Sequence, residues 1–166
     1  MTASRKVVYV DTNVIIEATR TGCWKAILNH FDVRTVTEVQ REALTVPANK
    51  KSYVPIDANL FNSHVKIETV GRIEVLKASV KSPGLTALDA GERDLLAHLA
   101  GLGDDVWLVT TADRAAVRTA CELKMDSRLV SLEHLAAECG QKPKVNDWFT
   151  NRWLGNVRTD FLFDSL

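Results

Sequence analysis

The sequence predicts an α/β fold with a mostly parallel central sheet. Short β-branched runs, of which Val7–Val10 is the clearest, alternate with stretches of helical periodicity along most of the chain. The run Val7–Val10 is continuously apolar, which is typical of a parallel strand buried on both faces. The links between the expected elements are short, as they are in strand–helix–strand units.

Each expected element follows from a local pattern. Short apolar runs predict strands at 7–10, 33–36, 65–70, 106–109 and 129–130. Periodic segments predict helices at 14–19, 24–30, 37–44, 73–80, 89–100, 113–123 and 132–138. We expect Thr37 to cap the third helix, and Ile73, Leu76 and Val80 to form one apolar face of the fourth.

The length and composition indicate one globular domain. The chain has 166 residues, of which 46% are hydrophobic and 25% charged, so disorder and a coiled-coil rod are excluded as classes. We expect a domain over 1–140 with an excursion around 47–83. Residues 45–63 are expected to form an exposed loop or a small hairpin. Residues 141–166 form a tail that is apolar and aromatic for a chain terminus. It either folds back on the domain or lies at a dimer or partner interface.

Cysteine usage and hydropathy indicate a reducing, aqueous compartment. The cysteines are odd in number and show no CxxC spacing, which argues against a disulfide framework and a structural zinc site. No signal-peptide pattern and no apolar run long enough to span a bilayer is visible. The sequence therefore predicts a cytoplasmic protein that does not contact a membrane.

The net charge of zero conceals one acidic segment. The 21 basic and 21 acidic residues cancel, which argues against binding nucleic acid by bulk basicity alone. Residues 89–113, however, contain six acidic residues and one basic residue, while the flanking segments are mildly basic.

Acidic residues follow the expected strands at the edge where ligands bind in parallel sheets. Asp11 comes directly after the first strand, Glu38 comes just after the second, and Asp113 lies shortly after 106–109. Each could instead cap a helix or complement its dipole. Glu42, one turn after Glu38 on the same helix face, is the alternative to Glu38.

Glu92 is the fourth acidic candidate. It lies three, four and seven residues before Leu95, Leu96 and Leu99, so it projects from the apolar face of its helix. Asp94, two residues on, is expected to point outward. Four carboxylates on one pocket repel each other unless a cation compensates them, and hard divalent cations prefer oxygen ligands. The pattern favours a metal site over four independent helix caps.

Other chemistries lack their motifs. The sequence contains no GxGxxG, no P-loop and no GxSxG, and its four histidines show no metal-ligand spacing. A receiver-like phosphoacceptor domain would need an acidic neighbour beside Asp11 and a lysine after a late strand, and both are missing.

Four ordered motifs resemble those of the PIN-domain ribonucleases. The segments VYVDTNVII at 8–16, VTEV at 36–39, GERDLLA at 91–97 and LVTTAD at 108–113 are similar to the four acidic motifs of that family. The resemblance covers 7–130 and implies a PIN-like three-layer α/β/α domain. It also implies an Mg²⁺- or Mn²⁺-dependent endoribonuclease, often a VapC-like toxin that pairs with an antitoxin protein and forms a homodimer.

The resemblance also implies roles for individual residues. Asp11, Glu38, Glu92 and Asp113 would be the catalytic acids, with Asp94 as a further candidate metal ligand beside Asp11, Glu92 and Asp113. Thr12, Asn13 and Thr110 would support them and contact the substrate.

An acidic pocket that binds RNA needs basic flanks. Arg114 and Arg118 share one helix face after Asp113 and are the first candidates for substrate contacts. Further candidates are Arg20, Lys25, Lys50 and Lys51. A non-catalytic PIN-fold module that binds RNA or protein is the alternative function.

Overall fold

The chain has an α/β fold built on one parallel sheet. The computed structural model describes residues 3–45 and 53–166. Within that part, four strands lie in the order β3-β2-β1-β4 and every neighbouring pair is parallel. The strands are β1 (Val7–Val10), β2 (Asp32–Val36), β3 (Lys66–Glu68) and β4 (Leu108–Thr110). The predicted α/β class with a parallel sheet is confirmed.

The last predicted strand is shorter than expected. Residues 129–130 contribute a single parallel bridge, in which Leu129 is paired with Val109 of β4. The sheet therefore ends at β4, with one further residue pair beside it.

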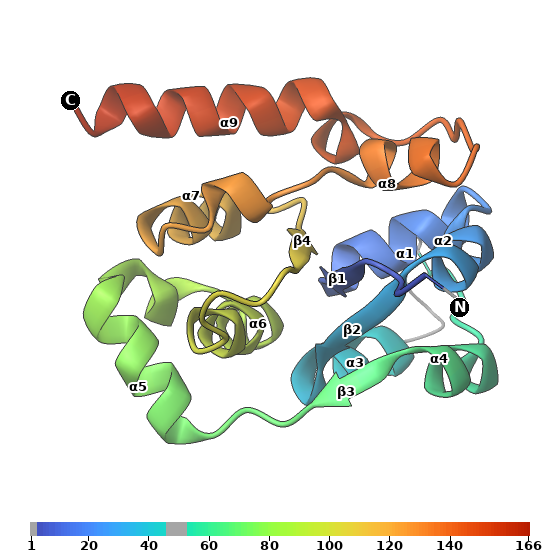
Figure 1. Cartoon of the computed structure of the whole chain (residues 1–166), viewed down its shortest axis with the longest axis horizontal. Coiled ribbons are helices and arrows are strands. Elements are labelled where there is room, and N and C mark those ends of the chain that lie inside the picture. The colour runs from blue at the N-terminus through green and yellow to red at the C-terminus, as the bar shows by residue number, and fades with distance from the viewer. Residues whose placement is uncertain (1–2, 46–52) are drawn as a thin grey trace.

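Helices cover both faces of the sheet and give three layers. Figure 1 shows α5, α6 and α7 on one side of the strands and α1, α2 and α4 on the other, with α9 running past the end of the sheet nearest β4. The chain steps from β1 to β2 to β3 in one direction and then crosses back to β4. Parallel crossovers are right-handed, so this reversal moves the later helices to the opposite face. The helices are α1 (Thr12–Arg20), α2 (Trp24–His30), α3 (Thr37–Leu44), α4 (Ala58–His64), α5 (Arg72–Lys81), α6 (Ala90–Ala100), α7 (Arg114–Glu122), α8 (Leu132–Glu138) and α9 (Asn151–Asp164).

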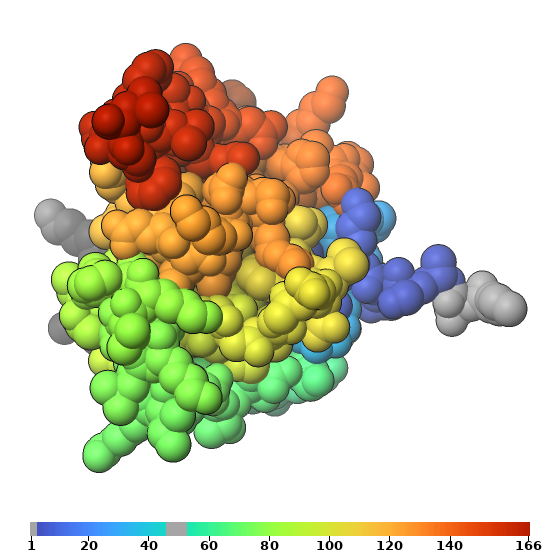
Figure 2. All heavy atoms as spheres, turned by 60° about the vertical axis from the view of Figure 1, so that its left-hand side comes forward, coloured from blue at the N-terminus to red at the C-terminus, as the bar shows by residue number. Residues whose placement is uncertain are grey.

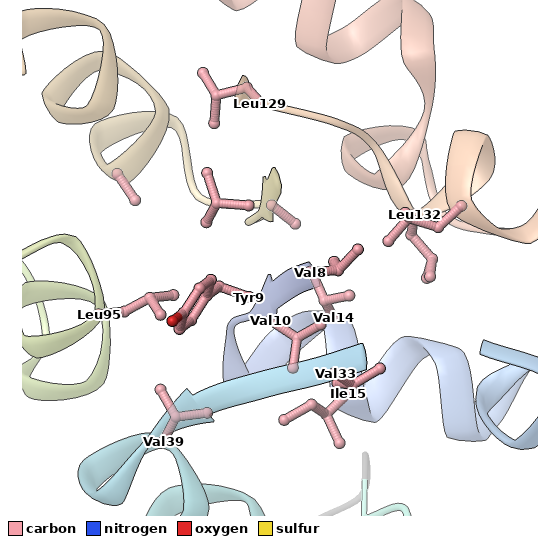
Figure 3. Packing of buried hydrophobic residues seen from close by; sticks show 14 of the residues in the cluster. Val8, Tyr9, Val10, Val14, Ile15, Val33, Val39, Leu95, Leu129 and Leu132 are labelled. Carbon is pink, nitrogen blue, oxygen red and sulfur yellow. The ribbon is translucent and has the colours of Figure 1, made fainter. Parts of the chain in front are cut away.

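The core lies on both sides of β1. Val8, Tyr9 and Val10 are each 2% exposed or less. Figure 3 shows Tyr9 directed toward Leu95 of α6, while Val10 lies on the side of α1. Successive side chains of a strand point to opposite faces, so a strand covered on both faces needs an uninterrupted apolar run.

The prediction for the apolar face of α5 is wrong. Ile73, Leu76 and Val80 are 68%, 64% and 84% exposed, and Ala78 is the buried residue of this helix. Helix α6 lies between α5 and the sheet, so α5 is an outer helix that contacts α6 through its small residue (Figure 1). Periodicity shows that a helix has an apolar face but does not show whether a neighbour covers it.

The prediction of a loop or hairpin at 45–63 is wrong for its second half. Residues 58–64 form α4, which Asp57 caps by accepting a hydrogen bond from the amide of Leu60 at 3.0 Å. Phe61 of this helix is fully buried, and its ring stacks on Trp24 with 6.4 Å between centroids. Residues 46–52, which include the candidates Lys50 and Lys51, lie outside the described residues.

The helix N-terminus at α3 also differs from the expectation. Val36 occupies the N-cap position and Thr37 is the first helical residue, so Thr37 does not cap the helix. Its hydroxyl instead donates to the backbone oxygen of Glu68 in β3 at 3.4 Å.

The tail folds back along the domain. Helix α9 packs on α7 and buries Leu154 and Val157, while Phe163 and Leu166 at its end stay exposed. None of the helices in the described part of the chain has the length and apolarity to cross a membrane.

Candidate active site

Asp11 lies at the carboxyl end of β1, the central position in the sheet. The side chain is 2% exposed and caps α1, with Oδ1 accepting a hydrogen bond from the Thr12 amide at 2.7 Å. Oδ2 accepts a second hydrogen bond from the Thr111 hydroxyl at 3.0 Å. The pKa of Asp11 is raised to about 6. Burial is the largest cause, the two hydrogen bonds lower it, and the charges of Glu42 and Asp113 raise it.

Asp113 follows β4 at the same edge of the sheet. Its carboxylate caps α7 by accepting a hydrogen bond from the Ala116 amide at 2.9 Å. The amide of Asp113 donates to the Thr111 hydroxyl at 3.4 Å. Thr111 thus contacts both aspartates through one oxygen and fixes the ends of β1 and β4 relative to each other.

Glu92 enters the site from the first turn of α6. The residue is 8% exposed, and Leu95, Leu96 and Leu99 on the same helix are buried with it, which confirms the predicted inward face. The pKa of Glu92 is raised to about 8. Burial is the largest cause, the charges of Asp11, Asp113 and Asp89 also raise it, and a hydrogen bond from the Asp89 backbone lowers it. Glu92, Asp11 and Asp113 therefore share one electrostatic environment.

Glu42 is the acidic residue of α3 that joins this group. Its Oε2 accepts a hydrogen bond from the Thr12 hydroxyl at 2.8 Å, and its Oε1 accepts one from the Gly91 amide at 3.0 Å. A Cβ atom at Gly91 would stand 2.5 Å from Oε2, so any other residue here would push the Glu42 carboxylate out of this position. Glu42 thereby connects α1, α3 and α6 at the carboxyl edge of the sheet.

Glu38 lies outside the group. Its carboxylate is paired with Arg41, whose hydrogen bond holds the pKa of Glu38 below its usual value, with a further contribution from Arg93. Charges of the other acids have no part in this shift. Of the two alternatives on α3, the structure places Glu42 with Asp11 and leaves Glu38 in an arginine pair.

Asp94 also lies outside the group. It is bound by Arg93 at 2.9 Å and borders a surface cavity of about 400 Å³ between α5 and α6. Its helix face does not point to solvent as expected, because α5 covers it and Ala97 on the same face is buried. Glu92 and Asp94 thus occupy opposite sides of α6, as the helical geometry predicted.

Of the three polar residues expected to support the acids, only Thr12 contacts one of them through its side chain in the described structure. Thr12 binds Glu42, whereas Asn13 is exposed. The hydroxyl of Thr110 is buried and has no hydrogen-bond partner among the described residues. The neighbouring Thr111 makes the contact with Asp11 instead. The TTAD sequence after the strand was the only signal for Thr111, and it did not distinguish the two hydroxyls.

The arginines among the predicted basic flanks form ion pairs within the chain. Arg114 and Arg118 each bind an aspartate of α9, both at 2.9 Å. Arg20 binds Glu17 at 2.5 Å, and Lys25 is exposed on α2.

The donor set of the site suits a hard divalent cation. Four carboxylates converge there, and in the described part of the chain none of the four forms an ion pair with a basic side chain. Burial raises the pKa values of Asp11 and Glu92, and the charges of neighbouring acids raise them as well: Glu42 and Asp113 act on Asp11, and Asp11, Asp113 and Asp89 act on Glu92. Within residues 3–45 and 53–166, no three acidic, histidine or cysteine side chains are placed so that they could hold a metal ion together. The residue types fit the ion, because hard divalent cations prefer carboxylate oxygens.

Comparison with known proteins adds no family assignment. No known family model matches the chain, and no curated protein is significantly similar to it in sequence. The resemblance to PIN-domain ribonucleases thus stays a prediction that depends on the four motifs.

Proposed function

We propose that this protein is a metal-dependent endoribonuclease whose active site is the group Asp11, Glu42, Glu92 and Asp113. One observation carries the proposal: the buried carboxylates Asp11 and Glu92 at the carboxyl edge of the sheet both have raised pKa values. Burial is the largest cause and neighbouring acids add to it, while neither residue forms an ion pair with a basic side chain of the described residues. Uncompensated charge of this kind is costly for a fold and is characteristic of functional sites. RNA as the substrate follows from the motif resemblance.

The chain's own residues would divide the work as follows. Asp11 is held in one orientation by the Thr12 amide and the Thr111 hydroxyl, which each donate to one of its two oxygens. Glu42 is fixed by Thr12 and Gly91, and Glu92 approaches from the opposite side on α6. Mg²⁺ or Mn²⁺ bound there would lower the pKa of a water molecule and stabilise charge on a phosphate. The burial of Asp11 and Glu92 keeps bulk water from these two acids and strengthens their electrostatic interactions.

The biological setting proposed here is that of a bacterial toxin with an antitoxin partner in the cytoplasm. The support is the motif resemblance, together with an exposed apolar surface on α5, formed by Ile73, Leu76 and Val80, that a second copy of the chain or a partner protein could cover. Co-expression with the protein of a neighbouring gene, followed by size-exclusion chromatography, tests this role.

One observation favours a second candidate, a non-catalytic RNA- or protein-binding module. Asp11 and Asp113 cap helices, and Glu42 joins α1 to α6, so each also has a structural role. Under this alternative the acids hold the edge of the sheet together and no cation is needed.

A cleavage assay separates the two candidates. Purified protein is incubated with single-stranded RNA and Mn²⁺ or Mg²⁺, in parallel with Asp11→Asn and with Asp105→Asn as a matched change at an exposed acid. We expect cleavage by the wild type and by Asp105→Asn, and a loss of at least about a hundredfold for Asp11→Asn. Equal cleavage by all three proteins, or none by the wild type with either metal, would contradict the proposal.

A further inference from the structure

The arginines of α7 are covered by a matching pair of aspartates from α9. Arg114 binds Asp160 and Arg118 binds Asp164, both with 2.9 Å between nitrogen and oxygen. Both pairs are spaced four residues apart, so on each helix the two charges lie on one face, one turn apart. The guanidinium of Arg118 also lies over the ring of Phe161, 5.6 Å from its centroid.

This arginine pair stands next to the proposed active site. Arg114 directly follows Asp113, the acid that caps α7, and Arg118 lies one turn further along the helix. A basic helix face in this position is suited to the phosphates of a bound nucleic acid, because guanidinium groups bind phosphate and carboxylate oxygens in the same geometry. Here carboxylates of the chain itself occupy those donors.

The end of α9 has fewer buried contacts than its start. The fully buried apolar residues of the helix, Leu154 and Val157, lie in its first half. In the second half, Phe161 is only partly buried against the core, and Leu162 and Phe163 are 64% and 69% exposed. The two ion pairs are solvent-exposed, and such pairs contribute about 0.2–1 kcal/mol each and weaken with added salt. Figure 2 shows this end of α9 in red, lying directly against α7 in orange on the outer face of the molecule.

We propose that the α7 face formed by Arg114 and Arg118 is a binding surface for the backbone of single-stranded RNA, and that Asp160 and Asp164 of α9 compete with the RNA phosphates for it. The inference rests on the proposed function for the identity of the ligand. The competition weakens RNA binding by the intact chain until the end of α9 is displaced. A long enough strand displaces it by exchanging two exposed ion pairs for phosphate contacts.

The test measures RNA binding without cleavage. A fluorescein-labelled single-stranded RNA is titrated with the full chain in EDTA at low and moderate salt, and its anisotropy gives Kd. The double variant Asp160→Asn/Asp164→Asn keeps the shape of α9 and frees both arginines. The matched control is Asp104→Asn/Asp105→Asn. It removes the same charge from the exposed loop that precedes β4, at the amino ends of the strands.

We expect the α9 variant to bind RNA about five- to tenfold more tightly than the wild type, whereas the control variant changes Kd by less than about twofold. We also expect a steeper salt dependence of Kd for the α9 variant, because two more phosphate contacts release counterions. Adding Arg114→Ala and Arg118→Ala to the α9 variant should abolish the gain. Circular dichroism and thermal unfolding of each variant verify that α9 remains folded.

Two results would overturn the inference. One is an equal gain in the α9 and control variants, which would be a general charge effect. The other is a gain that survives the arginine substitutions, which would place the RNA elsewhere. Because binding is measured without metal, the inference stands if the α9 variant gains affinity for RNA but neither protein cleaves it. In that case only the nuclease proposal fails.

Discussion

Two groups of acidic residues in this molecule differ in their neighbours. Glu17, Glu38, Asp94, Asp160 and Asp164 each bind an arginine. The other group, at the carboxyl edge of the sheet, has no such partner in the described residues. The pKa shifts follow the same division, since those of Glu17 and Glu38 are lowered and those of Asp11 and Glu92 are raised. Ionised carboxylates therefore stabilise the fold where they bind an arginine and destabilise it at the carboxyl edge of the sheet.

The largest expected effect is a loss of RNA cleavage. It appears when two acids on one helix are compared, Glu92 with Asp94 on α6 and Glu42 with Glu38 on α3. We expect Glu92→Gln and Glu42→Gln to reduce RNA cleavage by about thirtyfold or more, because each removes one carboxylate from the acidic group at the carboxyl edge of the sheet. The loss for Asp94→Asn and Glu38→Gln should be at least about tenfold smaller. Initial rates at saturating Mn²⁺ measure the difference. A larger loss at Asp94 than at Glu92 would overturn the assignment on α6.

The second effect is a gain in stability when an uncompensated acid is neutralised. The raised pKa of Glu92 means that its ionisation opposes folding. The wild type should therefore lose stability as pH rises from about 4.5, the ordinary glutamate value, toward about 8. In EDTA at pH 8 we expect Glu92→Gln to be about 1–2 kcal/mol more stable than the wild type, and the gain should vanish near pH 4. Urea unfolding across this range measures it, and a less stable variant at pH 8 would contradict the account.

Glu17 predicts the opposite dependence on pH. Burial alone would raise its pKa, but hydrogen bonds from Arg20 and from the Asn146 amide, the latter at 2.7 Å, more than offset this and lower it. A lowered pKa stabilises the fold above the ordinary glutamate pKa, and this contribution is lost as pH falls through the folded-state value. We expect Glu17→Gln to cost about 1–2 kcal/mol at pH 7 and less at pH 3.5. Urea unfolding at both values tests it, and an equal cost at both would contradict the assignment.

The smallest effect concerns Gly91. An added methyl group would meet the Glu42 carboxylate, which lies at the end of a flexible side chain and can move. We expect Gly91→Ala to reduce cleavage about three- to tenfold with less than about 1 kcal/mol change in stability, since the loss is mainly the hydrogen bond from the Gly91 amide. Gly155→Ala, where a methyl group would meet no atom within 4 Å, is the control. Full activity of Gly91→Ala would show that the position of Glu42 is unimportant.

The sequence was sufficient for the sheet and for most of its acidic edge. A strand that is buried on both faces has a continuous apolar run in its sequence. The residue that follows a parallel strand lies at the carboxyl edge of the sheet, independent of the rest of the fold. This rule located Asp11 and Asp113. The helical face of α6 located Glu92, because three buried leucines share it.

The remaining details depend on how the elements pack, which local patterns do not contain. Glu38 and Glu42 lie one turn apart on the same face of α3, and the approach of α6, with Gly91 at its start, decides which of them reaches Asp11. The exposed apolar face of α5 has the same explanation, since periodicity cannot show that α6 occupies the place against the sheet. The α7 arginines were expected to be open to the substrate, and only the return of α9 reveals their partners.

The most direct test of the central claim is calorimetric titration of Mn²⁺ into metal-free protein at pH 7.5. If the four unpaired acids form a cation site, the wild type binds Mn²⁺ with a measurable heat and releases protons. The free energy of unfolding then rises by about 2.7 kcal/mol when the Mn²⁺ concentration is about a hundred times Kd. Asp11→Asn should lose this binding, while Asp105→Asn keeps it. Equal binding by the wild type and Asp11→Asn, or no binding by either, would show that the acidic edge of the sheet is not a metal site.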